Sequence, residues 1–288
     1  MNSGLEKAIA LLRRGDAESV EAALQGIQRT LFYFGIKLCG QREDAEDTAQ
    51  EVLVKSLPHL AKLDEPRALS SWLYKAAKNR CFRNRKKSSY RREVALEDLM
   101  PSEAELSALR HDETGASPEV QALRSEDHRM LHQALLRLPP QYRIVLVLHD
   151  MEELDTSLVA NILSLAPGTV RVRLHRARLM VRNEISNLLR GQPQKTADIK
   201  PLKASAACME VFANLSDYLD RELTLESCEQ IRSHIEACPT CVAFIHDLKL
   251  AIDRCRSLDI CSNAEAPPPL RRLLTEEYLR LVKTRSNL

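Results

Sequence analysis

Nowhere does this chain carry an apolar run close to the roughly 20 residues that a membrane-spanning helix needs. Its first apolar stretch is too short for a signal peptide and is followed by charges. Aromatic residues make up only 4% of the 288 residues, glycine occurs 8 times, and 44% of the residues are hydrophobic. The net charge of +2 does not by itself indicate a nucleic-acid partner. We therefore expect a cytoplasmic, globular protein rich in helices.

The cysteines and the charges are unevenly placed. Of eight cysteines, six lie between Cys208 and Cys261. In a reducing cytoplasm such clustering indicates metal binding or redox sensing rather than a disulfide scaffold. Basic runs such as "RNRKKSSYRR" and "RVRLHRAR" are separate from acidic runs such as "EDLMPSEAEL", so the charge is segregated although its sum is small.

The order of helical patterns and breakers predicts an all-α protein with three helical blocks. The segments between the blocks are polar and contain proline and glycine. The predicted divisions are a first block at 5–92, an acidic linker at 93–119, a second block at 120–191, a linker at 192–206 and a third block at 207–288. In a predicted last helix, one face is shared by Leu270, Leu273, Leu274, Tyr278 and Leu281.

The first block contains an acidic helix and then a basic one. In "EDAEDTAQEVLVKSL" small and apolar residues form one stripe, and the acidic and amide residues lie elsewhere on the helix. Pro58 and the stretch "KLDEPRAL" break this pattern, and "SSWLYKAAKNRCFRNRKK" begins a new helix after a serine cap. The stripe comprises Ala45, Ala49, Val52 and Ser56.

The second block carries a helix-turn-helix pattern, "TSLVANILSLAPGTVRVRLHRAR". The apolar run "QYRIVLVLHDM" before it could pass for a strand, but its helical neighbours favour a helix. Pro167 opens the second helix of the pattern, where its missing N–H is no loss. An exposed basic helix after a tight turn suits a major-groove reader, although a solvated basic face is the alternative. The predicted inward face is Val170, Leu174, Ala177 and Val181; the outward face is Arg171, Val172, His175 and Arg178, flanked by Arg173 and Arg176.

Together these blocks resemble a bacterial sigma factor. "ALLRLPPQYRIVLVLHDMEEL" and the helix-turn-helix resemble region 4, which binds the −35 promoter element, and the acidic and basic helices of the first block resemble region 2. With only a short acidic linker between them, the chain is similar to an extracytoplasmic-function (group 4) sigma factor over roughly residues 20 to 190. The resemblance implies a factor that acts with RNA polymerase core to start transcription at specific promoters, and no enzymatic activity.

The resemblance also implies roles for individual residues. In the family, the acidic helix docks on the clamp helices of the polymerase β′ subunit; the matching residues are Asp44, Asp47, Gln50 and Glu51. The −10 element is bound as flipped bases and single-stranded backbone; the matching residues are Trp72, Asn79, Arg80, Arg83, Lys86 and Lys87. Trp72 also fits a core position. For the −35 element they are Thr169, Arg171, Val172, Arg173, His175, Arg176 and Arg178.

Three positions depart from the usual pattern of the family. Arg83 stands where an acidic residue is frequent, Ser164 where the turn has glycine, and Leu158 where the scaffold helix is commonly acidic. These departures bear on promoter specificity and not on the class of protein. The acidic segment from Glu93 to Glu126 either runs near the polymerase active centre, as the resemblance implies, or is only a spacer.

The third block carries "HIEACPTC", which offers three zinc ligands as His-x3-Cys-x2-Cys. His234 and Cys238 lie one helical turn apart, and Cys241 can fold back onto the same ion. A closed tetrahedral site needs a fourth ligand, for which Cys208 is the first candidate and Cys228 the second. A zinc deaminase is excluded, because its His–Glu pair and Cys pair lie on separate helices around an open zinc position.

The stretch "CMEVFANLSDYLDRELTLESCEQIRSHIEACPTC" resembles the zinc-containing anti-sigma domain, with Cys208 at the upstream ligand position. The resemblance implies one Zn²⁺ ion and an intramolecular contact with the sigma regions, to which the last helix could contribute. The zinc could be purely structural, or metal exchange or thiol oxidation could signal to the sigma regions. Cys39 and Cys81 are predicted to be ordinary buried thiols. For Cys228, Cys255 and Cys261 three alternatives stay open, which are binding of a second metal ion, resolution of a disulfide, and no role.

Two other classes of protein fit the sequence less well than a sigma factor. A stand-alone helix-turn-helix regulator has no reason to carry "DAEDTAQE" and "SSWLYKAAKN". A metal-dependent enzyme would need an acid, a base and a nucleophile around one cleft, and the sequence offers no such set.

Overall fold

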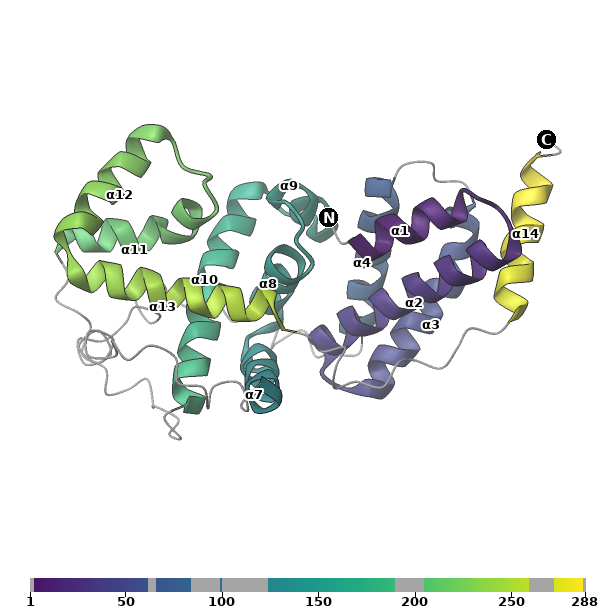
Figure 1. Ribbon diagram of the computed structural model, residues 1–288, viewed down its shortest axis with the longest axis horizontal. Helices are drawn as coiled ribbons and strands as arrows, with labels where there is room; N and C mark the ends of the chain where they lie inside the picture. The colour runs from purple at the N-terminus through teal and green to yellow at the C-terminus, as the bar shows by residue number, and fades with distance from the viewer. Residues whose placement is uncertain are drawn as a thin grey trace. The chain divides into compact units, whose positions relative to one another are not determined.

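The structure is a computed structural model that describes residues 3–61, 66–83, 99, 124–189, 205–258 and 272–286 (Figure 1). Throughout these residues the regular structure is helical and no strand occurs, which confirms the all-α prediction. Lys86, Lys87 and Cys261 lie outside the described residues, as do nearly all residues of the two predicted linkers. The chain divides into two compact units.

The first unit comprises Met1–Lys87, Val147–Pro167 and Asp259–Leu288. Its main body is a bundle of α1 (Ser3–Leu12), α2 (Ala17–Cys39), α3 (Arg42–Leu60) and α4 (Pro66–Arg83). Helix α2 begins where Asp16 accepts the N–H of Ser19 at 2.8 Å and ends at Gly40, whose φ of 74° glycine adopts without strain. The predicted stripe of α3 is buried, which confirms it as the core-facing side. The acidic residues of α3 are thereby left for the surface.

Residues 147–163 and the last helix complete the first unit. The π-helical turn η3 (Val147–Met151) leads to α9 (Thr156–Leu163), which packs against α4. Ser164 ends α9 with φ 56° and ψ 48°, the left-handed conformation for which the family's usual glycine is suited. Helix α14 (Arg272–Ser286) packs against α2 and α3. Its predicted apolar face is only partly right, because Tyr278 is buried whereas Leu273 is 67% exposed.

The second unit comprises Ser88–Leu146 and Gly168–Leu258. Its helices are α7 (Arg124–Arg137), α8 (Pro140–Leu146), α10 (Pro167–Leu189), α11 (Ala206–Leu219), α12 (Leu225–Ala237) and α13 (Pro239–Arg256). The run "QYRIVLVLHDM" is helical as predicted, in α8 and η3. All four residues of the predicted inward face of α10 are buried.

Helices α11, α12 and α13 contact one another pairwise and are called the cysteine domain below. Ser205 and Thr224 cap α11 and α12 by accepting backbone N–H groups. Phe212 of α11 and Phe244 of α13 pack edge to face with their ring centres 5.0 Å apart. This small core sets the spacing between the two helices.

Candidate metal centre and candidate DNA-binding helix

Four side chains of the cysteine domain form a cluster of ligand atoms. The Sγ atoms of Cys208, Cys238 and Cys241 and a ring nitrogen of His234 all lie within 4.8 Å of one another. Nε2 of His234 is 3.4 Å from the Cys208 Sγ and 3.3 Å from the Cys241 Sγ. The Sγ atoms of Cys208 and Cys238 are 4.0 Å apart. Zn–S bonds of about 2.3 Å in a tetrahedron place two sulfur ligands about 3.8 Å apart, so the cluster has the size of a zinc site.

Helix termini bring these ligands together. Cys208 lies in the first turn of α11, where its N–H is donated to the Ser205 hydroxyl at 3.2 Å. Cys238 joins α12 to α13 in an extended conformation, and Cys241 lies in the first turn of α13. Burial raises the pKa of the Cys241 thiol; at Cys238 burial acts in the same sense but is outweighed by hydrogen bonds from Cys241, which lower its pKa. A bound metal ion would hold the ligand thiols as thiolates.

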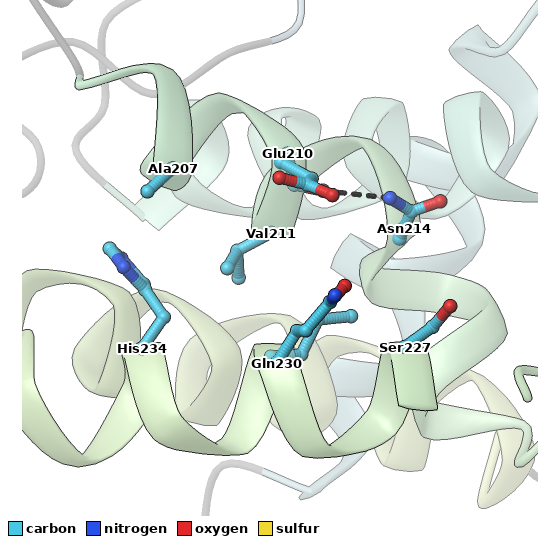
Figure 2. Close-up of a pocket in the computed structure, with 8 residues that line it drawn as sticks. Ala207, Glu210, Val211, Asn214, Ser227, Gln230 and His234 are labelled. Carbon is cyan, nitrogen blue, oxygen red and sulfur yellow. Dashed lines mark hydrogen bonds between the residues drawn. The ribbon is translucent and has the colours of Figure 1, made fainter. Parts of the chain in front are cut away.

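Of the two candidates for the fourth ligand, the structure brings Cys208 and not Cys228 to the cluster. Four protein ligands would leave zinc no open position, which is the pattern of a structural site rather than of a deaminase. A small pocket lies beside His234, between α11 and α12 (Figure 2). Its polar lining comprises Glu210, Asn214, Ser227 and Gln230.

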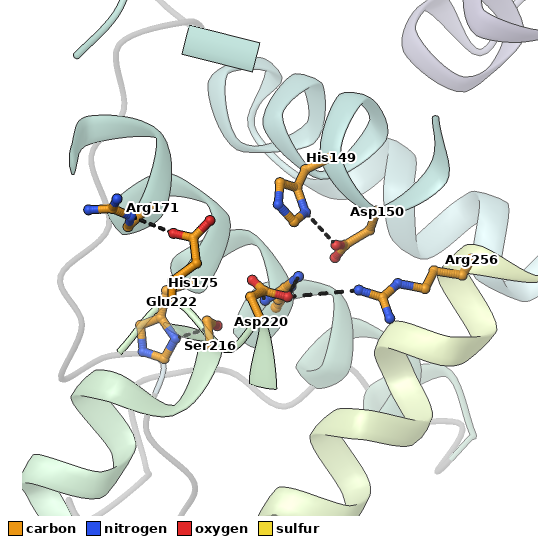
Figure 3. Close-up of polar contacts among 9 residues, drawn as sticks. His149, Asp150, Arg171, His175, Ser216, Asp220, Glu222 and Arg256 are labelled. Carbon is orange, nitrogen blue, oxygen red and sulfur yellow. Dashed lines mark hydrogen bonds and ion pairs between the residues drawn. The ribbon is translucent and has the colours of Figure 1, made fainter. Parts of the chain in front are cut away.

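One face of α10 lies against the cysteine domain. Arg178 is fully buried and donates two hydrogen bonds to the Asp220 carboxylate, at 2.6 and 2.9 Å. Nδ1 of His175 lies 2.8 Å from the Ser216 hydroxyl oxygen (Figure 3). The sequence predicts that Arg178 and His175 are exposed, and this is wrong for both. Ser216 of α11 contacts His175, and Asp220, the residue after α11, binds Arg178.

Ion pairs extend this contact along α10 in both directions. The Arg171 Nε atom lies 2.5 Å from a carboxylate oxygen of Glu222 (Figure 3). The Arg182 Nε atom lies 2.6 Å from a carboxylate oxygen of Asp247 on α13. The guanidinium of Arg182 also stacks 5.1 Å from the ring centre of Phe244. Of the other residues predicted to bind the −35 element, Thr169 and Val172 are exposed and Arg173 and Arg176 are half-buried.

His175 is held neutral by its surroundings. Burial lowers its pKa to about 4, and the positive charges of Arg178 and Arg176 act in the same direction. Its Nε2 atom is buried and has no hydrogen-bond partner within the described residues. Protonation would therefore place an additional positive charge beside two arginines, inside the contact between α10 and α11.

The residues predicted to bind polymerase and the −10 element lie in the first unit. Asp44, Asp47 and Gln50 are exposed on α3. Glu51 is half-buried, and it forms ion pairs with Lys55 of its own helix and with Arg80 of α4. The acidic surface of α3 is therefore accessible within this unit, except where Arg80 covers Glu51.

Helix α4 presents a mixed set of candidate −10 residues. Trp72 is half-buried with its ring centre 4.5 Å from that of His59, so it is neither a full core residue nor a free stacking surface. Asn79 is exposed. Arg83 ends α4, and its side chain lies outside the described residues.

Sequence reasoning missed the acidic partners of α10. Asp220 and Glu222 both lie within "SDYLDREL", part of the stretch that carried the resemblance to the anti-sigma domain, and Asp247 lies on α13. The excess of carboxylates in that stretch was a usable signal of a basic partner. Sequence spacing alone does not say which basic helix they face.

Comparisons with known proteins agree with the predicted sigma regions and with the predicted zinc-binding domain. Family models described as "Sigma-70 region 2" and "Sigma-70, region 4" match residues 24–91 and 128–181, and a "Putative zinc-finger" model matches residues 208–241. The chain is 28% identical to the ECF RNA polymerase sigma factor SigW of Bacillus subtilis, over 65% of this chain and 100% of that protein.

Two further relatives carry similar names. The chain is 29% identical to the RNA polymerase sigma-H factor of Pseudomonas aeruginosa, over 64% of this chain and 95% of the relative. It is 30% identical to the ECF RNA polymerase sigma-E factor of Haemophilus influenzae, over 51% of this chain and 78% of the relative.

The match to sigma region 2 does not favour a stand-alone helix-turn-helix regulator, because such a regulator needs no polymerase-binding region. Within the described residues, no helix has the length and apolar character to cross a membrane. The chain belongs to the extracytoplasmic-function sigma factors of RNA polymerase, with an anti-sigma-like zinc-finger domain fused after its region 4.

Proposed function

We propose that the cysteine domain is a built-in inhibitor of this sigma factor, which is closed by one zinc ion and covers the −35-binding face of α10. The pairing of Arg178 with Asp220 carries the proposal. A guanidinium that binds a phosphate or a guanine edge must offer free N–H groups. When the cysteine domain covers α10, which is called the closed chain below, two N–H groups of Arg178 already donate hydrogen bonds to the Asp220 carboxylate. Acidic side chains of the cysteine domain thus take the place of DNA.

The spacing of the contacts supports this competition. Arg171, His175, Arg178 and Arg182 follow one another at three or four residues, so they form one stripe of α10. A helix in the major groove presents one such stripe to the bases and backbone. Because the inhibitor is part of the same chain, its effective concentration is on the order of millimolar. A contact of modest intrinsic strength is then enough to keep α10 covered.

The four ligands fit zinc in number, chemistry and spacing. When bound, a zinc ion would cross-link the first turns of α11 and α13 to the end of α12. Farther along, α11 carries Ser216 and α13 carries Asp247, which both contact α10. Cys208, His234, Cys238 and Cys241 would therefore fix the spacing of the helices that hold α10. This arrangement is compatible with a purely structural zinc ion. It is equally compatible with a zinc ion that is released in response to another metal or to an oxidant.

The first unit supplies the other partners in this proposal. The exposed residues of α3 dock on basic clamp helices of the polymerase core, and α4 binds the single-stranded −10 element. The acidic surface of α3 is available within the first unit, so we expect the full chain to bind core polymerase. The predicted core-binding residues are Asp44, Asp47, Gln50 and Glu51; those for −10 DNA are Trp72, Asn79, Arg80, Arg83, Lys86 and Lys87.

Substitution of Asp220 tests the inhibitor role. In Asp220→Asn the buried Arg178 loses its charged partner, which should cost the closed contact about 3–5 kcal/mol. Holoenzyme made with this full-length variant should bind a −35 duplex at least tenfold more tightly than wild type and give more run-off transcript. Asp253→Asn, on an exposed part of α13, changes the charge equally and should behave as wild type. Equal −35 affinity of Asp220→Asn and wild type would refute the inhibitor role.

A further inference from the structure

The pocket between α11 and α12 borders the proposed zinc site and has a volume of about 100 Å³. The two helices run antiparallel along it, so that Ala207 of α11 lies opposite His234 of α12 (Figure 2). Glu210 and Gln230 line the pocket next to this pair. His234 is therefore shared: it belongs to the ligand cluster and also to the wall of the pocket.

The two ring nitrogens of His234 have different surroundings. Nε2 makes both contacts with the cysteine thiols, at 3.4 Å from the Cys208 Sγ and 3.3 Å from the Cys241 Sγ. Nδ1 has no hydrogen-bond partner in the part of the chain that the structure describes. An imidazole that binds zinc through Nε2 carries its proton on Nδ1, which is then a donor. Histidine ligands of zinc almost always donate this second N–H to a carboxylate, a backbone carbonyl or water.

Two side chains on the wall of the pocket can serve as acceptors. Asn214 is already engaged, because its amide donates to the backbone carbonyl of Glu210 at 3.0 Å. Among the described residues, neither the Glu210 carboxylate nor the Gln230 amide is hydrogen-bonded to another protein group. Gln230 lies four residues before His234, and hence on the same face of α12. Acceptor groups from both helices thus border the pocket beside the His234 ring.

The size and the lining of the pocket suit ordered water. One water molecule needs about 10–15 Å³ of such volume and two to four polar partners, so the pocket has room for several. Glu210, Gln230 and Nδ1 of His234 supply polar partners on both walls. Within the described residues Glu210 belongs to no further cluster of metal-binding groups, so the pocket does not have the lining of a second metal site.

We propose that Glu210 and Gln230 are positioning residues of the zinc site, which hold water in the pocket against the Nδ1 proton of His234. Such an acceptor fixes the orientation of the imidazole and makes its other nitrogen a stronger ligand. The two residues therefore set how tightly zinc is bound, and so how readily a competing metal or a chelator opens the cysteine domain. This inference rests on the zinc ion of the proposed function and extends it beyond the four ligands.

The zinc affinity of the full-length chain, measured by competition with a chelator of known affinity, tests this role. Glu210→Ala removes the charged acceptor and should weaken zinc binding about tenfold or more. Glu210→Gln retains an acceptor oxygen without the charge, and its affinity should stay within about threefold of wild type. The matched control is Glu229→Ala on α12, whose side chain is 79% exposed and does not line the pocket. It should bind zinc as wild type does.

Nitrogen-15 NMR of the zinc-loaded chain separates positioning from a general effect on stability. In wild type the Nδ1 proton of His234 should exchange slowly with solvent, because an ordered acceptor holds it. The exchange should be faster in Glu210→Ala and unchanged in Glu229→Ala. A merely structural role of Glu210 would lower the melting temperature and leave this exchange rate as it is.

A second variant keeps the test decisive. Gln230→Ala removes the other acceptor at an exposed position, and it should weaken zinc binding about threefold even if Glu210→Ala fails to fold. If wild type binds no zinc, the proposed metal centre is wrong and this inference is wrong with it. If wild type binds one zinc ion and every folded variant of Glu210 and Gln230 binds it equally tightly, the metal centre stands and the positioning role is refuted.

Discussion

Mild acid should loosen the contact between α10 and the cysteine domain through His175. In the closed chain burial lowers the pKa of His175 from 6.5 to about 4. The closed state is the one in which the cysteine domain covers α10. A histidine whose pKa is lower in the closed state than in the open state stabilises the closed state, and this contribution is fully present above the ordinary pKa of histidine. That contribution is lost as the pH falls from about 6.5 toward about 4. Protonation of His175 therefore opposes closing in this window.

The size of the effect follows from the two pKa values. The difference between 6.5 and about 4 corresponds to about 3.4 kcal/mol at full protonation, at about 1.36 kcal/mol per unit. Between about pH 7.5 and about pH 5.5 the closed state should lose about a factor of ten, or about 1.4 kcal/mol. Burial raises the pKa of Asp217, whose protonation favours the closed state, so the test is best kept above about pH 5.5.

Direct titration of His175 by NMR is the appropriate assay, because a protonated histidine would also attract DNA and confuse a binding measurement. His175→Gln assigns the resonance. In the full-length wild type, the His175 ring should stay neutral down to about pH 5. In Asp220→Arg, which places like charges at the contact, the ring should titrate near its ordinary value of 6.5. A wild-type His175 that titrates near 6.5 would refute the burial on which this reasoning rests.

Two further variants probe the metal centre and the turn after α9. Cys238→Ser, or removal of metal by a chelator, should release one zinc ion per chain and raise the affinity for the −35 duplex. Cys228→Ser is the control and should do neither. If the metal-free chain is folded and binds the duplex with wild-type affinity, zinc has no part in covering α10. Ser164→Gly should be more stable than Ser164→Ala by about 1 kcal/mol in thermal unfolding, because both lack the hydroxyl and only alanine is strained at φ 56°. Equal melting temperatures would contradict that strain.

Short-range patterns made much of the fold predictable from sequence. The stripe of α3 and the inward face of α10 are fixed by helical periodicity, and each is buried as expected. The metal cluster was also accessible, because three of its ligands lie within eight residues and a tetrahedral ion requires a fourth. Cys208 was ranked before Cys228 although Cys228 lies much closer in sequence, and the resemblance to the anti-sigma domain supports that order.

The long-range contacts could not be predicted in the same way. Glu152 follows the apolar run of η3, and nothing nearby in sequence distinguishes it from the adjacent, exposed Glu153. Its side chain is buried, and its hydrogen-bond partners Lys37 and Tyr74 lie on α2 and α4. A carboxylate is stable in a core only when the tertiary fold supplies such partners, so its burial cannot be inferred from local pattern.

Arg178 shows why periodicity also failed at the most informative position. Arg178 lies four residues after Leu174, so helical periodicity places it at the border of the inward face of α10 and not opposite it. Periodicity alone does not say whether water, DNA or another part of the chain covers a residue at that border. Guanidinium groups bind phosphates and carboxylates with the same two N–H donors. A basic stripe that is predicted to bind promoter DNA can therefore also bind Asp220, and this shared chemistry is the basis of the proposal that the cysteine domain competes with DNA for α10.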